Sequence, residues 1–222
     1  MEMKGHILVV FPHPDDEAFG VAGTVALARK IGTPVTYVCG TLGEMGRNMG
    51  RPLFANRETL PQIRKNELEE VARVLDIQDL RMLGLRDKTL EFLDEEEFAG
   101  KIKAIIDEVK PTYIITHYPG YAVHPDHNAT GAAVVRAVSK MLESERPVVL
   151  AHAFSNGCRE VLGEPDVVIP IDEVKDTKIA ALQAHRSQIE GMIGSIKTED
   201  LLNSPFVTRL LDKEEFWTYR FK

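Results

Sequence analysis

Apolar runs and helix-like segments alternate along this chain. Short apolar runs rich in β-branched residues predict strands at 6–11, 35–39, 79–83, 112–117, 148–154 and 166–171. Segments with apolar residues at helical spacing lie between them and predict helices at 17–31, 61–76, 95–110, 127–145 and 173–187. This order is typical of an α/β fold with a mainly parallel sheet.

The first four strand segments are almost entirely apolar, as expected of strands covered on both faces. We therefore expect a Rossmann-like, mainly parallel sheet with helices on both faces, in a single domain that spans residues 1–222. The final segment, 215–221, alternates aromatic and polar residues and predicts a strand at the edge of the sheet. The irregular stretch from about 41 to 59 predicts a long loop, which we interpret as a wall or lid of an active site, the alternative being a mobile surface loop.

The composition narrows the class of protein. With 222 residues, of which 44% are hydrophobic, the chain can bury one sizeable core. The formal net charge of -7 argues against a nucleic-acid partner and favours a small-molecule substrate. No apolar stretch approaches the ~20 residues that span a bilayer, and the start of the chain lacks a signal-peptide pattern, so we expect no membrane partner and a cytoplasmic location. Cys39 and Cys158 are far apart and predict no disulfide.

Two clusters of histidine and aspartate directly follow predicted strands. His-Pro-Asp-Asp-Glu at 13–17 comes after the first strand, and His-Pro-Asp-His at 124–127 comes shortly after the fourth. In a parallel sheet, chemistry gathers at the carboxyl ends of the strands, so we expect the two clusters to lie close together. Nitrogen and carboxylate ligands without any thiolate fit a hydrolytic zinc site better than a structural one.

Each aspartate, taken alone, also has an ordinary interpretation as a helix N-cap. Asp15 or Asp16 could cap the helix after the first cluster, and Asp126 could cap the helix after the second. Capping needs a single acceptor, however, so it does not explain two adjacent carboxylates or the two histidines that flank Asp126. The joint pattern therefore favours a metal site.

Five short motifs stand out along the chain. They are Pro12-His13-Pro14-Asp15-Asp16-Glu17, Thr41-Leu42-Gly43-Glu44, the pair Arg64 and Glu67, His124-Pro125-Asp126-His127, and His185 with Ser187 and Gln188. In this order they resemble the signature set of the PIG-L/LmbE zinc-dependent de-N-acetylases, and the resemblance runs from the first strand to about residue 190. The residues around the first two motifs are most similar to the deacetylases of bacillithiol biosynthesis, in particular the second of the two types found in bacilli. Those enzymes remove the acetyl group from an N-acetylglucosaminyl malate.

The resemblance implies roles for three residues of the first cluster. His13 and Asp16, together with His127, would hold a zinc ion, for which Fe(II) could substitute with these ligands. Asp15 would be the general base that takes a proton from the attacking water. The resemblance also implies a small amino-sugar conjugate as substrate and a homo-oligomeric assembly.

The second cluster supplies a candidate for stabilising negative charge in the reaction. His124 is our candidate hydrogen-bond donor to the oxyanion that forms on the acetyl carbonyl. We expect Asp126 to orient the imidazole of His124 and to keep it protonated.

Candidate substrate contacts are mostly arginines, because a guanidinium can bind both oxygens of a carboxylate. The resemblance makes Arg64 a contact to the sugar or its aglycone, with Glu44 and Glu67 as supports. His185 lies either at the rim of the site or in the interior as a structural histidine. Three more arginines, in or beside the long loop, are free to meet the malate carboxylates: Arg47, Arg51 and Arg57.

Other functions are also open. A deacetylase of another N-acetylglucosamine compound, such as a chitin-type oligosaccharide, would use the same site. A non-catalytic zinc or sugar-binding module is disfavoured because it has no need of Asp15. A Rossmann-type dehydrogenase or methyltransferase is disfavoured because Gly43, Gly46 and Gly50 do not have the spacing of a dinucleotide fingerprint.

Overall fold

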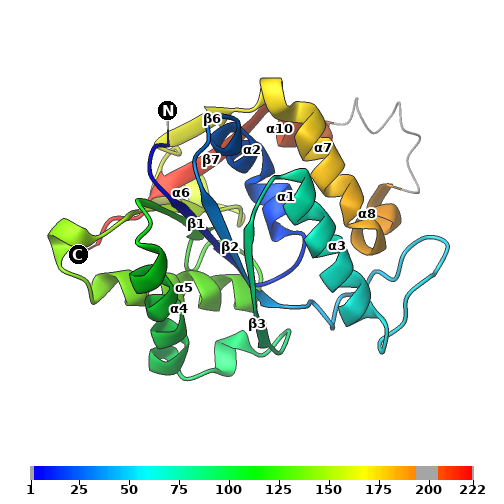
Figure 1. The fold of residues 1–222 in the computed structure, drawn as a ribbon, viewed down its shortest axis with the longest axis horizontal. Helices are drawn as coiled ribbons and strands as arrows, with labels where there is room; N and C mark the ends of the chain where they lie inside the picture. The colour runs from blue at the N-terminus through cyan, green and yellow to red at the C-terminus, as the bar shows by residue number, and fades with distance from the viewer. Residues whose placement is uncertain (1–2, 194–204, 222) are drawn as a thin grey trace.

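The computed structural model describes residues 3–193 and 205–221. Its strands, drawn in Figure 1, are β1 (Ile7–Phe11), β2 (Val35–Thr41), β3 (Asp79–Leu85), β4 (Tyr113–His117), β5 (Val148–His152), β6 (Val167–Pro170) and β7 (Lys213–Thr218). They form one seven-stranded sheet in the order β3-β2-β1-β4-β5-β7-β6. The expected α/β fold with a mainly parallel sheet is confirmed.

Helices connect most of these strands. The α-helices are α1 (Asp16–Gly20), α2 (Ala22–Lys30), α3 (Leu60–Val74), α4 (Glu95–Val109), α5 (Pro125–Ser139), α6 (Cys158–Leu162), α7 (Lys175–Ala184), α8 (Arg186–Ile193) and α10 (Pro205–Asp212). Three 3-10 turns are η1 (Leu90–Phe92), η2 (Glu143–Glu145) and η3 (Asp172–Val174). The helix expected at 127–145 is wrong at both ends, since α5 starts at Pro125, whose fixed φ suits a first helical turn, and stops at Ser139. No helix within the described residues is long and apolar enough to cross a membrane.

The central strand β1 supplies side chains to two separate cores. Ile7, Val9 and Phe11 pack on one face of the sheet with residues of α2, α3 and α7. Leu8 and Val10 point to the other face and pack with residues of α4 and α5. Figure 1 shows these two groups of helices on opposite sides of the sheet. The continuously apolar sequence of β1 is therefore explained by the helices that cover both of its faces, as expected.

Two expectations about the sheet are wrong. β3 lies at an edge and is mostly half-buried, so it is not enclosed like β1 and β2, and it carries the charged residues Asp79 and Arg81. β7 lies inside the sheet, antiparallel to both β5 and β6, and not at the edge. Its alternating pattern shows that its two faces differ, but the pattern contains no information about which strands lie beside it.

The order of β3, β2, β1, β4 and β5 is that of a Rossmann-type sheet. β1 pairs in parallel with β2 on one side and with β4 on the other, so consecutive connections leave β1 in opposite directions. The place between β1 and β4, where the direction of the connections reverses, is called the switch point of the sheet. Ligands of such sheets bind in the crevice there, outside the carboxyl ends of the strands. Both histidine and aspartate clusters follow strands that flank this crevice.

Candidate metal centre and active site

Nitrogen and carboxylate atoms from two strand ends meet at the carboxyl edge of the sheet. Nδ1 of His13, in the segment after β1, lies 3.2 Å from Nε2 of His127 in α5 and 3.6 Å from Oδ2 of Asp16. Oδ1 of Asp16 lies 3.1 Å from the same nitrogen of His127. The structure thus brings together the three residues that we expect from the sequence as metal ligands.

The spacing of these atoms suits a tetrahedral zinc ion. Ligand atoms about 2.0–2.1 Å from such an ion lie about 3.3–3.4 Å from one another. The 3.2 Å between the two nitrogens and the 3.1 Å from His127 to Oδ1 of Asp16 lie near that value, while the 3.6 Å from His13 is measured to the other oxygen of Asp16, Oδ2. Two imidazoles and one carboxylate also leave one tetrahedral position for water or substrate, which is the pattern of catalytic zinc sites.

Hydrogen bonds orient both imidazoles toward this centre. Nδ1 of His127 donates to the carbonyl oxygen of Ala122 at 2.9 Å, which leaves a lone pair on Nε2. Nε2 of His13 lies 3.2 Å from a carboxylate oxygen of Asp126 and 3.1 Å from one of Asp87, so it carries the proton and Nδ1 faces the ligands. The rings are therefore held in the tautomers that metal ligation requires.

Asp126 contacts His13 and not the ring of His124. Its fully buried carboxylate also accepts the backbone N–H groups of Lys88, at 2.7 Å, and Leu90, at 3.1 Å. The expectation that Asp126 orients His124 and keeps it protonated is therefore wrong. Nδ1 of His124 instead accepts the N–H of Asp126 at 3.1 Å and caps α5, while burial lowers the pKa of His124.

His124 nevertheless lies at the candidate centre. Its ring meets that of His13 edge-on, with centroids 4.9 Å apart, and one of its nitrogens is within 4.8 Å of ligand nitrogens of His13 and His127. Since Nδ1 accepts a hydrogen bond in the cap, Nε2 carries the proton of the neutral ring. The interpretation of Asp126 as a helix cap is also wrong, because His124 occupies that position.

Asp15 stands beside the ligands in a strained backbone conformation, with φ of 119°. It occupies the cap position of α1, yet its side chain makes no capping hydrogen bond to the described residues. Nη2 of Arg64 donates to Oδ2 of Asp15 at 3.0 Å, and the Asp15 N–H donates to Oε2 of Glu17 at 3.2 Å. Burial raises the pKa of Asp15 to about 6, although the Arg64 guanidinium opposes this shift. A carboxylate poised near neutrality suits a general base.

Two residues at the centre are missing from our expectations. His117 is the last residue of β4; its ring stacks on that of His127, with centroids 4.1 Å apart, and its Nε2 lies 3.7 Å from Oδ2 of Asp16. Burial lowers the pKa of His117 to about 4, so the ring is neutral at pH 7. Asp87 follows β3 and holds His13. The sequence signal that identifies both residues is a polar side chain at, or just after, the carboxyl end of a predicted strand, since these ends share one edge of the sheet.

Two of the expected substrate contacts are buried. The side chain of Arg64 is only 4% exposed, and its guanidinium donates to the carbonyl oxygens of Gly43, at 2.9 Å, and Pro14 in addition to Asp15. His185 is fully buried, and its Nε2 contacts a carboxylate oxygen of Glu17. A direct substrate contact by His185 at the rim is therefore contradicted, and the interpretation as a structural histidine holds.

Glu44 and Arg57, the other two residues expected to contact the substrate, hold the long loop in place. The carboxylate of Glu44 accepts the N–H of Asp87 at 3.0 Å. Arg57 lies on the surface, where its Nη1 donates to the carbonyl oxygens of Glu44, at 3.3 Å, and Gly46, at 2.6 Å. Glu44 is thereby tied to the protein backbone, whereas the exposed Arg57 can still meet a substrate.

The loop between β2 and α3 is fastened to α8. The N–H of Gly50 donates to the carbonyl oxygen of Ser187 at 3.0 Å, and the side chains of Asn48 and Gln188 each donate to the other's backbone. Glu67 of α3 accepts both the N–H and the hydroxyl of Ser187 at 2.7 Å. These contacts favour a fixed wall of the site over a mobile surface loop.

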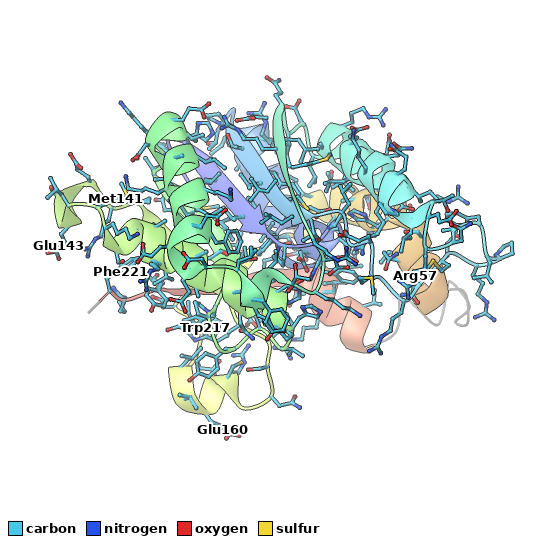
Figure 2. The ribbon with its side chains drawn as sticks, turned by 90° about the horizontal axis from the view of Figure 1, so that it is seen from below. Arg57, Met141, Glu143, Glu160, Trp217 and Phe221 are labelled. Carbon is cyan, nitrogen blue, oxygen red and sulfur yellow. The ribbon has the colours of Figure 1, made fainter. Side chains whose placement is uncertain are left out.

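A cavity of about 770 Å³ opens beside the metal centre, within the range of about 300–1,000 Å³ typical of ligand pockets. Asp16 and His127 line it at one end, and Phe154 and Trp217 are among its aromatic walls. Trp217 of this cavity and Arg57 of the long loop lie well apart in Figure 2. The site thus has room for a substrate larger than an acetyl group.

Comparison with known proteins identifies relatives over the whole chain. A protein of Bacillus subtilis (strain 168), described as a probable N-acetyl-α-D-glucosaminyl L-malate deacetylase 2, is 54% identical over 219 residues, which are 99% of this chain and 99% of that protein. A Bacillus cereus protein with the same description is 56% identical over 220 residues, covering 99% of this chain and all of that protein.

Solved structures share the fold. An N,N'-diacetylchitobiose deacetylase from Pyrococcus horikoshii superposes with a TM-score of 0.71 at 22% identity, covering 96% of this chain and 83% of that one. A conserved protein from Thermus thermophilus gives a TM-score of 0.70 at 24% identity, with coverages of 96% of this chain and 94% of that one.

The family model PIG-L, described as GlcNAc-PI de-N-acetylase, matches residues 8–138, a range that contains both histidine and aspartate clusters. This match, together with relatives more than half identical along the chain, shows that the protein belongs to the PIG-L family.

Proposed function

We propose that this protein is a zinc-dependent hydrolase that removes the N-acetyl group from N-acetylglucosaminyl malate, the reaction implied by its resemblance to the deacetylases of bacillithiol biosynthesis. The observation that carries the chemistry is the convergence of His13, Asp16 and His127 beside the partly buried carboxylate of Asp15. The substrate is supported by the two Bacillus relatives, whose descriptions name this malate conjugate.

His13, Asp16 and His127 would hold the metal. Zinc suits the spacing and the donor atoms, and Fe(II) is compatible with the same set. When bound, zinc lowers the pKa of a water molecule from 15.7 toward about 7 and polarises a carbonyl oxygen. The remaining chemistry belongs to side chains around the ligands.

Asp15 would take the proton from the attacking water. Arg64 binds Oδ2 of Asp15, which leaves Oδ1 to receive that proton. The water oxygen attacks the acetyl carbon, and the proton on Asp15 then passes to the departing sugar nitrogen. The products are acetate and a free amine.

His124 would donate from Nε2 to the acetyl oxygen as negative charge builds there. Its Nδ1 is fixed as an acceptor by the N–H of Asp126, so the neutral ring presents an N–H at Nε2. Donation by a neutral imidazole replaces the protonated His124 that we expect from the sequence. Such a donor matters most in the transition state.

Amine release from a panel of acetamido sugars tests the proposal. The panel holds N-acetylglucosaminyl malate, its methyl glycoside analogue with a neutral aglycone, and diacetylchitobiose. We expect the malate conjugate to exceed the neutral sugars by tens-fold in kcat/KM, because charge-assisted hydrogen bonds contribute ~1.5–3 kcal/mol each and ~1.4 kcal/mol is a factor of ten. His13→Ala is the control and should lose both metal and activity. Equal activity on all three substrates would favour a general deacetylase of N-acetylglucosamine compounds.

A further inference from the structure

His117, the last residue of β4, is a polar residue in a place built for an apolar one. Side chains two residues apart on a strand point to the same face, and Ile115 packs there in the core that also contains Phe11. The ring of His117 lies against that of Phe11, with centroids 4.5 Å apart, and the residue is 2% exposed. Neither of its ring nitrogens has a hydrogen-bond partner among the described residues. Such buried polar groups are rare, so packing alone does not explain this histidine.

The carboxylate of Asp16 offers an acceptor on the side of this ring. Its Oδ1 lies 3.1 Å from Nε2 of His127 and is the candidate ligand oxygen. Its Oδ2 accepts the N–H of His13 at 2.9 Å and has a second lone pair for another donor. Nε2 of His117 lies 3.7 Å from Oδ2, about half an ångström beyond a hydrogen bond. A small rotation of either side chain therefore completes the bond.

We infer that His117 is a positioning residue, which donates from Nε2 to Oδ2 of Asp16 and thereby directs Oδ1 toward the metal position. Since the carboxylate can only accept, Nε2 carries the proton. The ring also stacks on that of His127, with centroids 4.1 Å apart and an angle of 24° between the planes, so it restricts the rotation of this imidazole. One side chain of β4 thus supports two candidate ligands, from α1 and α5. This inference rests on the metal site of the proposed function.

Zinc affinity, measured by competition with a chelator, tests the role of His117. Carboxylates that hold a metal are usually hydrogen-bonded, and loss of such a partner typically costs 10–100-fold in affinity. His117→Leu removes the donor at similar volume, so we expect a fall of about this size. His117→Gln carries an amide N–H that reaches the place of Nε2, and it should bind zinc several-fold more tightly than His117→Leu. A merely structural role would lower the temperature of unfolding and leave both affinities at the wild-type value.

His152 provides the matched control. It is the register partner of His117 on the neighbouring strand β5, and the centroids of the two rings are 6.2 Å apart. Within the described part of the chain, no hydrogen bond or ion pair joins His152 to Asp16, so His152→Leu should bind zinc as the wild type does. Thermal unfolding of the metal-free proteins shows that each variant is folded. If His117→Leu fails to fold, His117→Gln and His117→Asn replace it, because the shorter amide of Asn does not reach Oδ2 of Asp16.

Three results would overturn the inference. The first is wild-type zinc affinity in folded His117→Leu, and the second is equal affinity in His117→Leu and His117→Gln, which would leave the donor without a role. The third is a change in the visible absorption of bound Co(II) in His117→Gln, because this absorption reports the coordination number and would make His117 a ligand. None of these measurements needs a substrate. A wild type that prefers another acetamido sugar would therefore contradict the substrate assignment alone, whereas a wild type that binds no zinc would contradict both proposals.

Discussion

Nε2 of His13 lies 3.2 Å from Oδ2 of Asp126, on the side of the ring opposite the candidate ligand atom Nδ1. A carboxylate in this place fixes the tautomer of a ligating imidazole and increases its basicity. Asp126 therefore supports a ligand residue of the candidate metal centre.

The first prediction follows from the contact between His13 and Asp126. Asp126→Asn keeps the shape of the side chain and removes its charge, so the affinity for zinc should fall about 10–100-fold. A competition titration against a chelator of known affinity measures the change. An unchanged affinity would mean that Asp87, 3.1 Å from the same nitrogen of His13, suffices alone.

The second prediction concerns Asp15. Asp15→Asn should retain one metal ion per chain and lose turnover, because general-base catalysis typically contributes ~10²–10⁴ in rate. Metal analysis and rate measurement on the same preparation decide this. His127→Ala provides the contrast, since it should lose the metal itself. Substantial activity in metal-loaded Asp15→Asn would show that another group is the base.

The third prediction separates two roles of His124. Asn is a favourable N-cap residue, so His124→Asn should keep α5 stable while it removes the donor at Nε2. We expect kcat to fall ~10²–10³-fold with KM little changed, as for the loss of one oxyanion donor. Thermal unfolding should match the wild type. A variant that raises KM alone would place His124 in substrate binding instead.

The fourth prediction concerns pH and the buried pair of His185 and Glu17. Burial lowers the pKa of His185, but the carboxylate of Glu17 outweighs it, and the net shift is upward from 6.5. A raised pKa contributes stability that is fully present below the unfolded value and is lost as pH rises through the folded value.

Unfolding by urea at pH ~6, below the ordinary histidine pKa of ~6.5, and again at a clearly alkaline pH tests this. The loss of unfolding free energy in His185→Gln should be larger at the lower pH. The difference between the two proteins removes the contribution of the metal ligands, which both share. A loss that is the same at both values would show that His185 is neutral in the folded protein.

The fifth prediction concerns a buried ion pair between α7 and β7. Lys178 and Glu214 are almost completely buried, and Glu214 also accepts the N–H groups of Gly23 and Thr24 at the start of α2. Lys178→Met should cost ~3–5 kcal/mol of unfolding free energy, because it leaves a buried carboxylate without its cation. Lys178→Met combined with Glu214→Gln should cost less than the sum of the single changes.

The sequence predicts the elements that carry a strong local pattern. β1 and β4 are continuous apolar runs, and the clusters after them contain more ionisable groups than caps require, so the meeting of His13, Asp16 and His127 follows from parallel topology alone. The sheet order places both clusters at the switch point.

Other features depend on partners that are distant in the sequence. The same Asp126 could hold His124, three residues before a ligand, or His13, more than a hundred residues away, and only tertiary packing decides for His13. The local sequence likewise does not reveal that Arg64, on α3, and His185, between α7 and α8, are buried. The carboxylate partner of each comes from the first cluster, which is distant in the sequence.

The place of β7 has a consequence for biosynthesis. This strand is translated after every other described strand, yet it pairs with β5 and β6, and among the described strands β6 has no other partner. A chain that stops before Lys213 would have both histidine and aspartate clusters but two open strand edges, and open edges readily pair with other molecules. The ribosome must therefore pass Thr218 before the edge of β5 is covered by β7 and β6 is joined to the sheet.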